Sequence, residues 1–371
     1  MKKKILIAFG TRPEALKFVP LIRALKSSPD FRCYICLTGQ HREMLNQVIH
    51  AFKIKSDAGL KLMKTNQSLE YVSGKVITEF GEIIRRIKPD LVFVLGDTAT
   101  AVMVALCSYY CGTPIAHLEA GLRTGDKYHP FPEEGNRKLI SHLADYHFTP
   151  TSIATANLLQ EGIGRKAIFQ VGNTIVDMIS LTKPLVKKEY PIFRDVDFKK
   201  RVLFVTAHRR ESFGRGLHEI FLALKMLARH FKNVEIVYPV HLNPHVLQPA
   251  RKILGTVERV HLLRPLTYEE TIWMISHCYL ILTDSGGIQE EAPSFKKPVL
   301  VLRHVTERPE GIYAGIAKTV GTNRVRIFHT AKMLLSSSNA YKRMVARRNP
   351  YGDGHCAKRV ISHLRKIFRL T

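Results

Sequence analysis

The sequence predicts an α/β fold with two doubly wound domains that face a central cleft. In the first half, short apolar strands alternate with segments of helical periodicity, as in KILIAFG (4–10) and then PEALKFVPLIRALKSS (13–28). This alternation is typical of a parallel sheet with helices on both faces. The pattern restarts at RVLFVTAHRRES (201–212), after a looser, charged stretch with two prolines at 182–200. We therefore expect ligands at the ends of strands, in the cleft between two domains.

The remaining elements follow in order. The first half adds strands at 31–39, 91–97 and 113–121 and helices at 41–52, 71–90 and 98–112. The second half adds helices at 217–231, 268–278 and 288–295 and strands at 234–240, 259–263, 279–284 and 298–303. We place the first domain at 1–172 and the second at 173–351, and expect a C-terminal helix at about 352–371 to pack back onto the first domain.

Composition indicates a cytoplasmic protein without a metal site. The chain has 371 residues, of which 45% are hydrophobic and 24% charged, as in ordinary globular proteins. Its apolar runs are strand-length, well short of the roughly 18 residues that would predict a membrane span. The apolar segment near the N-terminus is too short for a signal peptide. The six cysteines are scattered, and C-x-x-C in CYIC has no second pair to complete a zinc site.

The formal net charge of +26 favours a negatively charged partner. A phosphorylated ligand needs only a few cations, so most of this charge is interpreted as surface. Neither zinc-finger spacing nor an aromatic RNA-binding motif accompanies the basic C-terminal segment 341–371. We therefore expect no nucleic-acid partner.

One apparent cofactor motif is rejected by its position. GIGRKA (162–167) matches the dinucleotide pattern G-x-G-x-x-A, which must follow a strand and open a helix. Here it follows a helical segment and precedes a strand-like one, so we interpret it as the loop that ends a helix. No P-loop motif is present either, and no cofactor is expected.

The segment TDSGGIQEEAPS ends a strand and opens a helix. Ser285, Gly286 and Gly287 are thereby predicted at a helix N-terminus, where free N–H groups attract anions and glycine lets phosphate approach the backbone. Glu290 and Glu291 are expected in the first turn, where the helix dipole alone could account for them. Alternatively, one of these carboxylates accepts hydrogen bonds from a ribose.

Other polar residues follow predicted strands. They are Arg12, Lys17, Asp97, Glu119, Arg123, Glu133, Glu134, Arg137, His208, Arg209 and Arg210. Singly, each has an ordinary explanation, such as a helix cap, a surface ion pair or a loop histidine. Together, carboxylates, cations and a histidine beside a phosphate site predict proton transfer on a nucleotide-linked substrate.

Over nearly its full length, the chain resembles the non-hydrolysing UDP-N-acetylglucosamine 2-epimerases. The motifs that carry the resemblance are FGTRPEALK, TGQHREML, GDT, EAGLRTGD, PEEGNR, GNT, HRRESFG, YPVHLNP, TDSGGIQEEAPS, TERPE and NPYGDG. Hydrolysing relatives typically lack the EAGLRTGD…PEE run. The resemblance implies two Rossmann-like domains of the glycosyltransferase-B type, a homodimer, and interconversion of UDP-GlcNAc and UDP-ManNAc for bacterial surface polysaccharides.

The resemblance also implies roles for residues at matching positions. The catalytic group comprises Asp97, Glu119, Glu133, Lys17 and His208, of which His208 would also contact UDP. The substrate-binding group comprises Arg12, Arg137, Ser285, Gly286, Gly287 and Glu291. A second UDP-GlcNAc would act as an allosteric activator at Gln40, Gln67, Glu134, Arg209 and His241. Neither a metal ion nor a cofactor is implied.

These residue types suit the chemistry. The C2 proton of the sugar is not acidic, but loss of UDP from C1 builds oxocarbenium character that makes it removable. One carboxylate would act as base in an anti elimination to 2-acetamidoglucal, and an acid would return a proton to the opposite face. Three alternatives stay open: a 2-epimerase of another UDP-2-acetamido sugar, a retaining glycosyltransferase, and a basic nucleic-acid or membrane-surface protein that has kept an enzyme fold.

Overall fold

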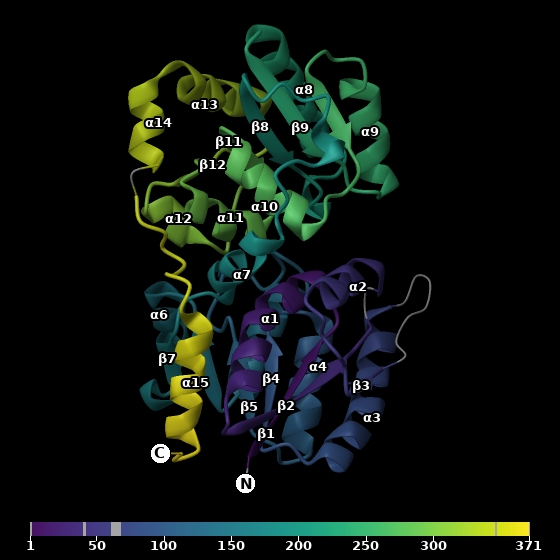
Figure 1. Ribbon diagram of the computed structural model, residues 1–371, viewed down its shortest axis with the longest axis vertical. Coiled ribbons are helices and arrows are strands. Elements are labelled where there is room, and N and C mark those ends of the chain that lie inside the picture. The colour runs from purple at the N-terminus through teal and green to yellow at the C-terminus, as the bar shows by residue number, and fades with distance from the viewer. Residues whose placement is uncertain (1, 40–41, 61–67, 346, 371) are drawn as a thin grey trace. The chain divides into compact units, whose positions relative to one another are not determined.

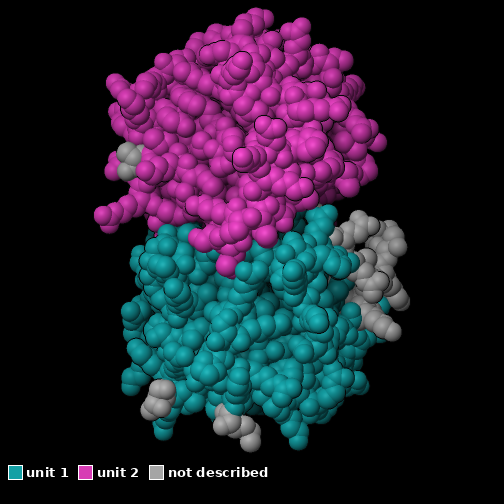
Figure 2. All heavy atoms as spheres, in the orientation of Figure 1, with its two compact units in different colours: residues 1–178, 351–371 teal, residues 179–350 magenta. Residues whose placement is uncertain are grey.

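The computed structural model describes residues 2–39, 42–60, 68–345 and 347–370. It divides into two compact units, which are coloured separately in Figure 2. Unit 1 comprises residues 1–178 and 351–371, and unit 2 comprises residues 179–350. Each unit is built on one parallel sheet (Figure 1). The prediction of an α/β fold with two doubly wound sheets is confirmed.

Unit 1 contains a seven-stranded sheet in the order β3-β2-β1-β4-β5-β6-β7. Its strands are β1 (Lys3–Phe9), β2 (Phe31–Leu37), β3 (Ala58–Gly59), β4 (Leu91–Leu95), β5 (Ile115–Leu118), β6 (Tyr146–Thr149) and β7 (Ile168–Gln170). Its helices are α1 (Arg12–Ser27), α2 (Arg42–Ala51), α3 (Leu69–Ile87), α4 (Ala99–Tyr110), α5 (Glu133–Leu143), α6 (Ser152–Gln160), the start of α7 (Thr174–Thr182), and α15 (Cys356–Ile367). The strand order reverses between β1 and β4, and ligands bind at such switch points in doubly wound folds.

Unit 2 contains a six-stranded sheet in the order β10-β9-β8-β11-β12-β13. Its strands are β8 (Arg201–Thr206), β9 (Val234–Pro239), β10 (Val260–Leu263), β11 (Leu280–Thr283), β12 (Val299–Val301) and β13 (Ala317–Thr319). Its helices are α8 (Arg215–His230), α9 (Pro244–Leu254), α10 (Tyr268–His277), α11 (Gly286–Glu291), α12 (Pro309–Tyr313), α13 (Arg324–Ser336) and α14 (Ser338–Val345). Here the order reverses between β8 and β11.

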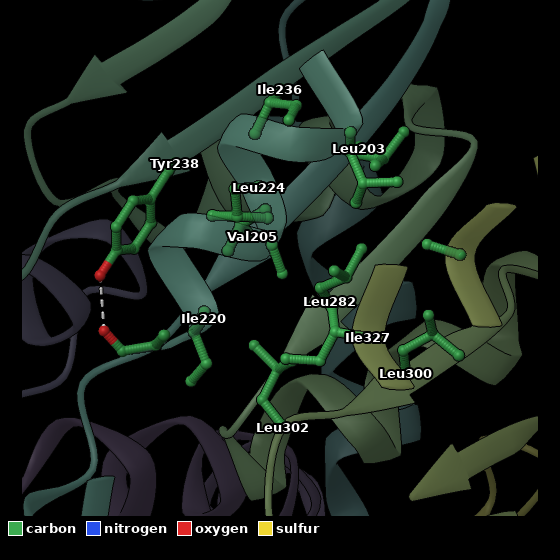
Figure 3. Packing of buried hydrophobic residues seen from close by; sticks show 14 of the residues in the cluster. Leu203, Val205, Ile220, Leu224, Ile236, Tyr238, Leu282, Leu300, Leu302 and Ile327 are labelled. Atoms are coloured by element: carbon green, nitrogen blue, oxygen red, sulfur yellow. Dashed lines mark hydrogen bonds between the residues drawn. The ribbon is translucent and has the colours of Figure 1, made fainter. Parts of the chain in front are cut away.

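One core cluster of unit 2 packs helix side chains against the sheet. Leu203 of β8 and Ile236 of β9 lie near Leu224 of α8 in this fully buried cluster (Figure 3). Tyr238 belongs to the same cluster, and its hydroxyl donates a hydrogen bond of 2.6 Å to the carbonyl oxygen of Ala207. The core therefore fixes the backbone where β8 ends.

The last helix, α15, belongs to unit 1. It packs against α1 (Figure 1). The ring centroids of His363 and of Phe169 on β7 lie 4.7 Å apart. The Asp177 carboxylate accepts hydrogen bonds from the backbone N–H groups of Cys356 and Ala357, at 3.1 and 2.9 Å. Asp177 thereby satisfies N–H groups at the start of a helix that lies far away in sequence.

One smaller sequence prediction can be compared directly with the structure. Gly162 and Gly164 lie between α6 and a 3₁₀ turn that precedes β7, so GIGRKA is a loop after a helix, as predicted. All six cysteines carry free thiols, and burial raises the pKa of Cys36 to about 12. In the part of the chain that the structure describes, no helix has the length and apolar character needed to cross a membrane.

A buried histidine pair predicts how the stability of unit 1 depends on pH. His117 on β5 and His147 on β6 are register partners. Burial is the main cause that lowers the pKa of His117 to about 3 and that of His147 to about 4. Between those values and about 6.5, the unfolded chain binds more protons than the folded chain, so stability falls as the pH falls. We expect each histidine to lower the free energy of unfolding by about 2 kcal/mol between pH 7 and pH 5.

Urea unfolding at both pH values measures this loss. The His147→Gln variant should lose about 2 kcal/mol less than the parent chain over the same interval. An identical loss in the two proteins would show that His147 is not held neutral in the folded state.

Candidate active site

The polar residues of unit 1 gather at the carboxyl ends of β1, β4 and β5. Asp97 lies two residues after β4, and Glu119 directly follows β5. Arg12 is the first residue of α1, which follows β1, and Lys17 lies one turn further along that helix. Glu133 begins α5. Because parallel strands end at one edge of the sheet, residues from distant parts of the sequence share this edge.

A buried carboxylate that the sequence analysis did not select joins two of these loops. Glu14 forms a capping box with Thr11 at the start of α1, and its Oε2 accepts a hydrogen bond of 2.8 Å from the Thr11 backbone N–H. Its Oε1 accepts a hydrogen bond of 2.8 Å from the Thr98 hydroxyl, on the loop after β4. Glu14 therefore bridges the switch point between β1 and β4.

Asp97 is paired with a buried cation. Its carboxylate forms an ion pair with the Arg137 guanidinium, whose side chain is only 1% exposed. Arg137 also contacts Oε2 of Glu134, with Nη2 at 2.8 Å and Nε at 3.0 Å. The other oxygen of Glu134 accepts from the backbone N–H groups of Thr124 and Gly125, at 3.1 and 3.2 Å. The arginine thus links the Asp97 loop to α5 and to the loop after β5.

Glu119 is paired with Lys17. The two side chains form an ion pair, and each is 7% exposed. Glu119 has φ +63°, in the left-handed region that non-glycine residues seldom occupy. Such strain is found preferentially at functional sites, because surrounding structure must hold it in place. At this edge of the sheet, two carboxylates at the ends of neighbouring strands therefore each face their own cation.

In unit 2, Asp284 organises the loop after β8. This fully buried residue follows β11, and its Oδ2 accepts hydrogen bonds from the backbone N–H groups of His208 and Arg209, at 2.6 and 2.8 Å. The His208 ring stacks on His241, with ring centroids 5.5 Å apart. Burial and the neighbouring His208 lower the pKa of His241. Asp284 therefore bridges the β8/β11 switch point of unit 2, as Glu14 bridges the β1/β4 switch point of unit 1.

The segment Ser285-Gly286-Gly287 opens α11, which begins at Gly286 and ends at Glu291. The prediction that Glu290 and Glu291 occupy the first turn is wrong. They are the last two residues of the helix, because it begins two residues earlier than Ile288. Both carboxylates are buried, and Glu290 accepts a hydrogen bond of 2.9 Å from Nε of Arg308. The helix dipole therefore does not account for them.

Arg308 also supplies a structural reason for the first glycine. A Cβ atom on Gly286 would lie 2.6 Å from the guanidinium carbon of Arg308, whereas the nearest atom to a Cβ on Gly287 would be Ser285 Oγ at 3.9 Å. Arg308 cannot easily move away, since its guanidinium is hydrogen-bonded to Glu290 and Glu307. Of these two glycines, Gly287 is therefore the one that leaves open space above its backbone.

This difference predicts unequal effects of two similar substitutions. Gly286→Ala should lower the free energy of unfolding by about 1–3 kcal/mol, as overpacking does. Gly287→Ala should change it by less than about 0.5 kcal/mol, as for surface changes that create no clash. Urea unfolding of the two variants makes the comparison. Equal values would mean that Arg308 does not restrict position 286.

The structure brings together most of the residues that the sequence analysis selected. In unit 1 these are Arg12, Lys17, Asp97, Glu119, Glu133, Glu134 and Arg137, and in unit 2 they are His208, Arg209, His241, Ser285, Gly286, Gly287 and Glu291. Gln40 and Gln67 lie outside the described residues. In the described part of the chain, no three His, Cys, Asp or Glu side chains are grouped so that they could hold a metal ion.

Known proteins resemble this chain throughout its length. A family model for UDP-N-acetylglucosamine 2-epimerase matches residues 23–365. The UDP-N-acetylglucosamine 2-epimerase of Escherichia coli K12 is 45% identical, covering 98% of this chain and 98% of that protein. The enzyme of the same name from Bacillus subtilis 168 is also 45% identical, covering 98% of this chain and 96% of that protein.

A solved structure agrees with these sequences. The crystal structure of UDP-GlcNAc 2-epimerase from Neisseria meningitidis bound to UDP-GlcNAc has a TM-score of 0.95 and 41% identity. It covers 98% of this chain, which in turn covers 100% of that one. Because the family model spans most of the chain and the relatives match over nearly their whole length, the chain belongs to the UDP-N-acetylglucosamine 2-epimerase family.

Proposed function

We propose that this protein catalyses the reversible C2 epimerisation of UDP-GlcNAc to UDP-ManNAc, which would serve bacterial surface polysaccharide synthesis. The observation that carries the proposal is the pair of carboxylates, Asp97 and Glu119, at the ends of neighbouring strands. Each is ion-paired with a buried cation, Arg137 or Lys17. An epimerase needs two acid–base groups, one for each face of C2.

The reaction proceeds by elimination and addition. Cleavage of the C1–O bond releases UDP with the bonding electron pair, and positive charge develops at C1. A carboxylate removes the C2 proton, giving 2-acetamidoglucal. A carboxylic acid then adds a proton to the opposite face of C2 while UDP re-adds at C1, so no oxidant is required. The two steps need one group that takes a proton and one that gives a proton, and groups in different surroundings suit these roles. The side chain of Glu119 is 7% exposed, whereas that of Asp97 is 29% exposed.

UDP is held through its phosphates and ribose in this proposal. The phosphates occupy the Ser285-Gly286-Gly287 segment, and the Glu291 carboxylate accepts from the ribose. The open space above Gly287 supports this placement. Arg12 and His208 contact the departing diphosphate, whose negative charge grows as C1–O breaks. Asp284 supports the role of His208, because it fixes the backbone N–H of that residue.

Regulation and assembly form a further part of the proposal. A second UDP-GlcNAc acts as activator and contacts Glu134, Arg209 and His241, and the cytoplasmic enzyme works as a homodimer. Glu134 is already joined to Arg137, the partner of Asp97. An activator that contacts Glu134 would therefore act on the predicted catalytic carboxylate of Asp97 through Arg137, which contacts both residues.

The proposal is tested by incubation with UDP-GlcNAc in D₂O, without added metal or NAD, followed by proton NMR. UDP-ManNAc carrying deuterium at C2, together with deuterium at C2 of recovered UDP-GlcNAc, supports the elimination–addition mechanism. Free ManNAc with UDP would indicate a hydrolysing enzyme instead. Unchanged UDP-GlcNAc without C2 exchange would overturn the proposed substrate and direct the assays to other UDP-2-acetamido sugars and to glycosyl transfer.

A further inference from the structure

The turn that carries Asp97 is held by side chains from three separate elements. It consists of Gly96, Asp97 and Thr98, between β4 and α4. His117 of β5 and Asn136 of α5 bind its first two carbonyl oxygens, and Glu14 of α1 binds its hydroxyl. These three side chains are buried, with 8% exposure or less. We call Glu14, His117 and Asn136 the turn clamp.

The His117 contact meets a specific need of the backbone. Gly96 has φ +66°, and its carbonyl oxygen lies 2.9 Å from Nε2 of His117. A buried carbonyl without a partner would cost about 1–3 kcal/mol. Because a carbonyl oxygen can only accept, Nε2 must carry a proton. Burial lowers the pKa of His117, so the ring is neutral and Nδ1 is unprotonated. Buried Nδ1 has no hydrogen-bond partner among the described residues, which is consistent with a neutral ring.

The other two contacts fix the next two residues. Nδ2 of Asn136 donates to the carbonyl oxygen of Asp97 at 2.8 Å. The Thr98 hydroxyl donates to Oε1 of Glu14 at 2.8 Å. The Asp97 carboxylate itself remains directed at Arg137. The clamp therefore holds the carbonyl oxygens of Gly96 and Asp97 and the hydroxyl of Thr98. A change there would move the Asp97 carboxylate without removing it.

We propose that Glu14, His117 and Asn136 are positioning residues, which hold the Gly96–Thr98 turn so that the Asp97 carboxylate keeps one orientation toward the sugar. This inference rests on the proposed function, since it concerns the orientation of a carboxylate that acts at C2. Misplacement of a reacting group by about 1 Å can lower a rate by 10²-fold. The clamp residues need no contact with substrate to have such an effect.

The test compares His117→Leu, which removes the donor, with His117→Gln, which keeps an N–H donor of similar reach. Asn136→Leu removes the second donor independently, so the test stands if a leucine at 117 prevents folding. Ser108→Ala is the matched control. Its hydroxyl donates a buried hydrogen bond of 2.7 Å to Val104 within α4 and does not contact the turn. For each variant, kcat, KM, Tm and backbone amide exchange by mass spectrometry are measured.

The two leucine variants should lower kcat by about tenfold or more, because a misplaced Asp97 carboxylate reacts more slowly. KM should stay within about threefold of the parent value. Amide exchange should rise in the peptide that covers 93–100 and remain unchanged elsewhere in unit 1. His117→Gln should restore most of kcat, and Ser108→Ala should resemble the parent. Leucine variants with parental kcat, or exchange that rises throughout unit 1, would overturn the clamp. If the parent enzyme incorporates no deuterium at C2 of the sugar, the proposed function fails. The clamp would then be tested by amide exchange alone, and leucine variants with unchanged amide exchange at 93–100 would overturn it.

Discussion

Asp97→Asn is expected to lower kcat for C2 exchange by about 10²–10⁴-fold, the usual contribution of a general acid or base. The amide keeps the size of the side chain and can still accept from Arg137, but it cannot take or return a proton at neutral pH. Asp97 is not among the groups proposed to contact UDP, and the Ser285-Gly286-Gly287 segment proposed to hold the phosphates lies in unit 2, so the affinity for UDP should stay within about threefold. Deuterium incorporation followed by NMR measures the rate, and calorimetry measures the binding of UDP.

The same strand supplies the control. Asp90 lies at the amino end of β4, where its carboxylate accepts from the backbone N–H of Lys4 at 2.8 Å. Asp90→Asn changes the same functional group at the opposite edge of the sheet, and should leave kcat within about twofold. An Asp97→Asn enzyme that exchanged C2 at the parental rate would remove Asp97 from the mechanism.

The architecture was predictable because its main strands are clear apolar runs. KILIAFG and LVFVLGD correspond to β1 and β4, which are fully or largely buried. Shorter strands went unrecognised. β3 has two residues, too few to display any pattern. β6 (YHFT) lacks the aliphatic residues that identified strands of the same length, such as β11 (LILT). The sheet order could not be inferred from local patterns either, since pairing depends on contacts between distant segments.

The predicted site residues shared one signal, polar side chains directly after buried strands. Residues that act through long-range contacts lacked it. Glu14 has a sufficient local explanation in its capping box with Thr11, which conceals its bond to Thr98, far away in the sequence. Arg308 follows no recognised strand, and only the fold places its guanidinium against Gly286. The sequence therefore revealed the residues proposed to act on the substrate more readily than residues such as Glu14 and Arg308, which support them through long-range contacts.

Arg308→Met is expected to lower the free energy of unfolding of unit 2 by about 3–5 kcal/mol, because it removes a cation that two buried carboxylates share. Glu307 retains its ion pair with Arg303. The side chains of Glu290 and Glu307 are 1% and 3% exposed. Although burial acts to raise the pKa of Glu307, Arg308 and Arg303 outweigh it and lower that pKa. The folded state therefore gains stability from ionised Glu307 above its ordinary pKa of 4.5, and loses it as the pH falls.

The matched control is Arg264→Met. Arg264 forms a similar two-point contact with Glu270, at 2.8 and 3.0 Å, but its side chain is 56% exposed. The Glu270 side chain is 7% exposed, but it also accepts a hydrogen bond of 2.8 Å from the Thr267 backbone N–H, and water can reach the place of the exposed arginine. We therefore expect a loss of at most about 1 kcal/mol, which urea unfolding should separate from the loss in Arg308→Met. A cycle with Gly286→Ala adds a second check. Once the guanidinium that a Cβ would meet is gone, the alanine should cost little in the Arg308→Met background, whereas an undiminished cost would show that another group restricts position 286.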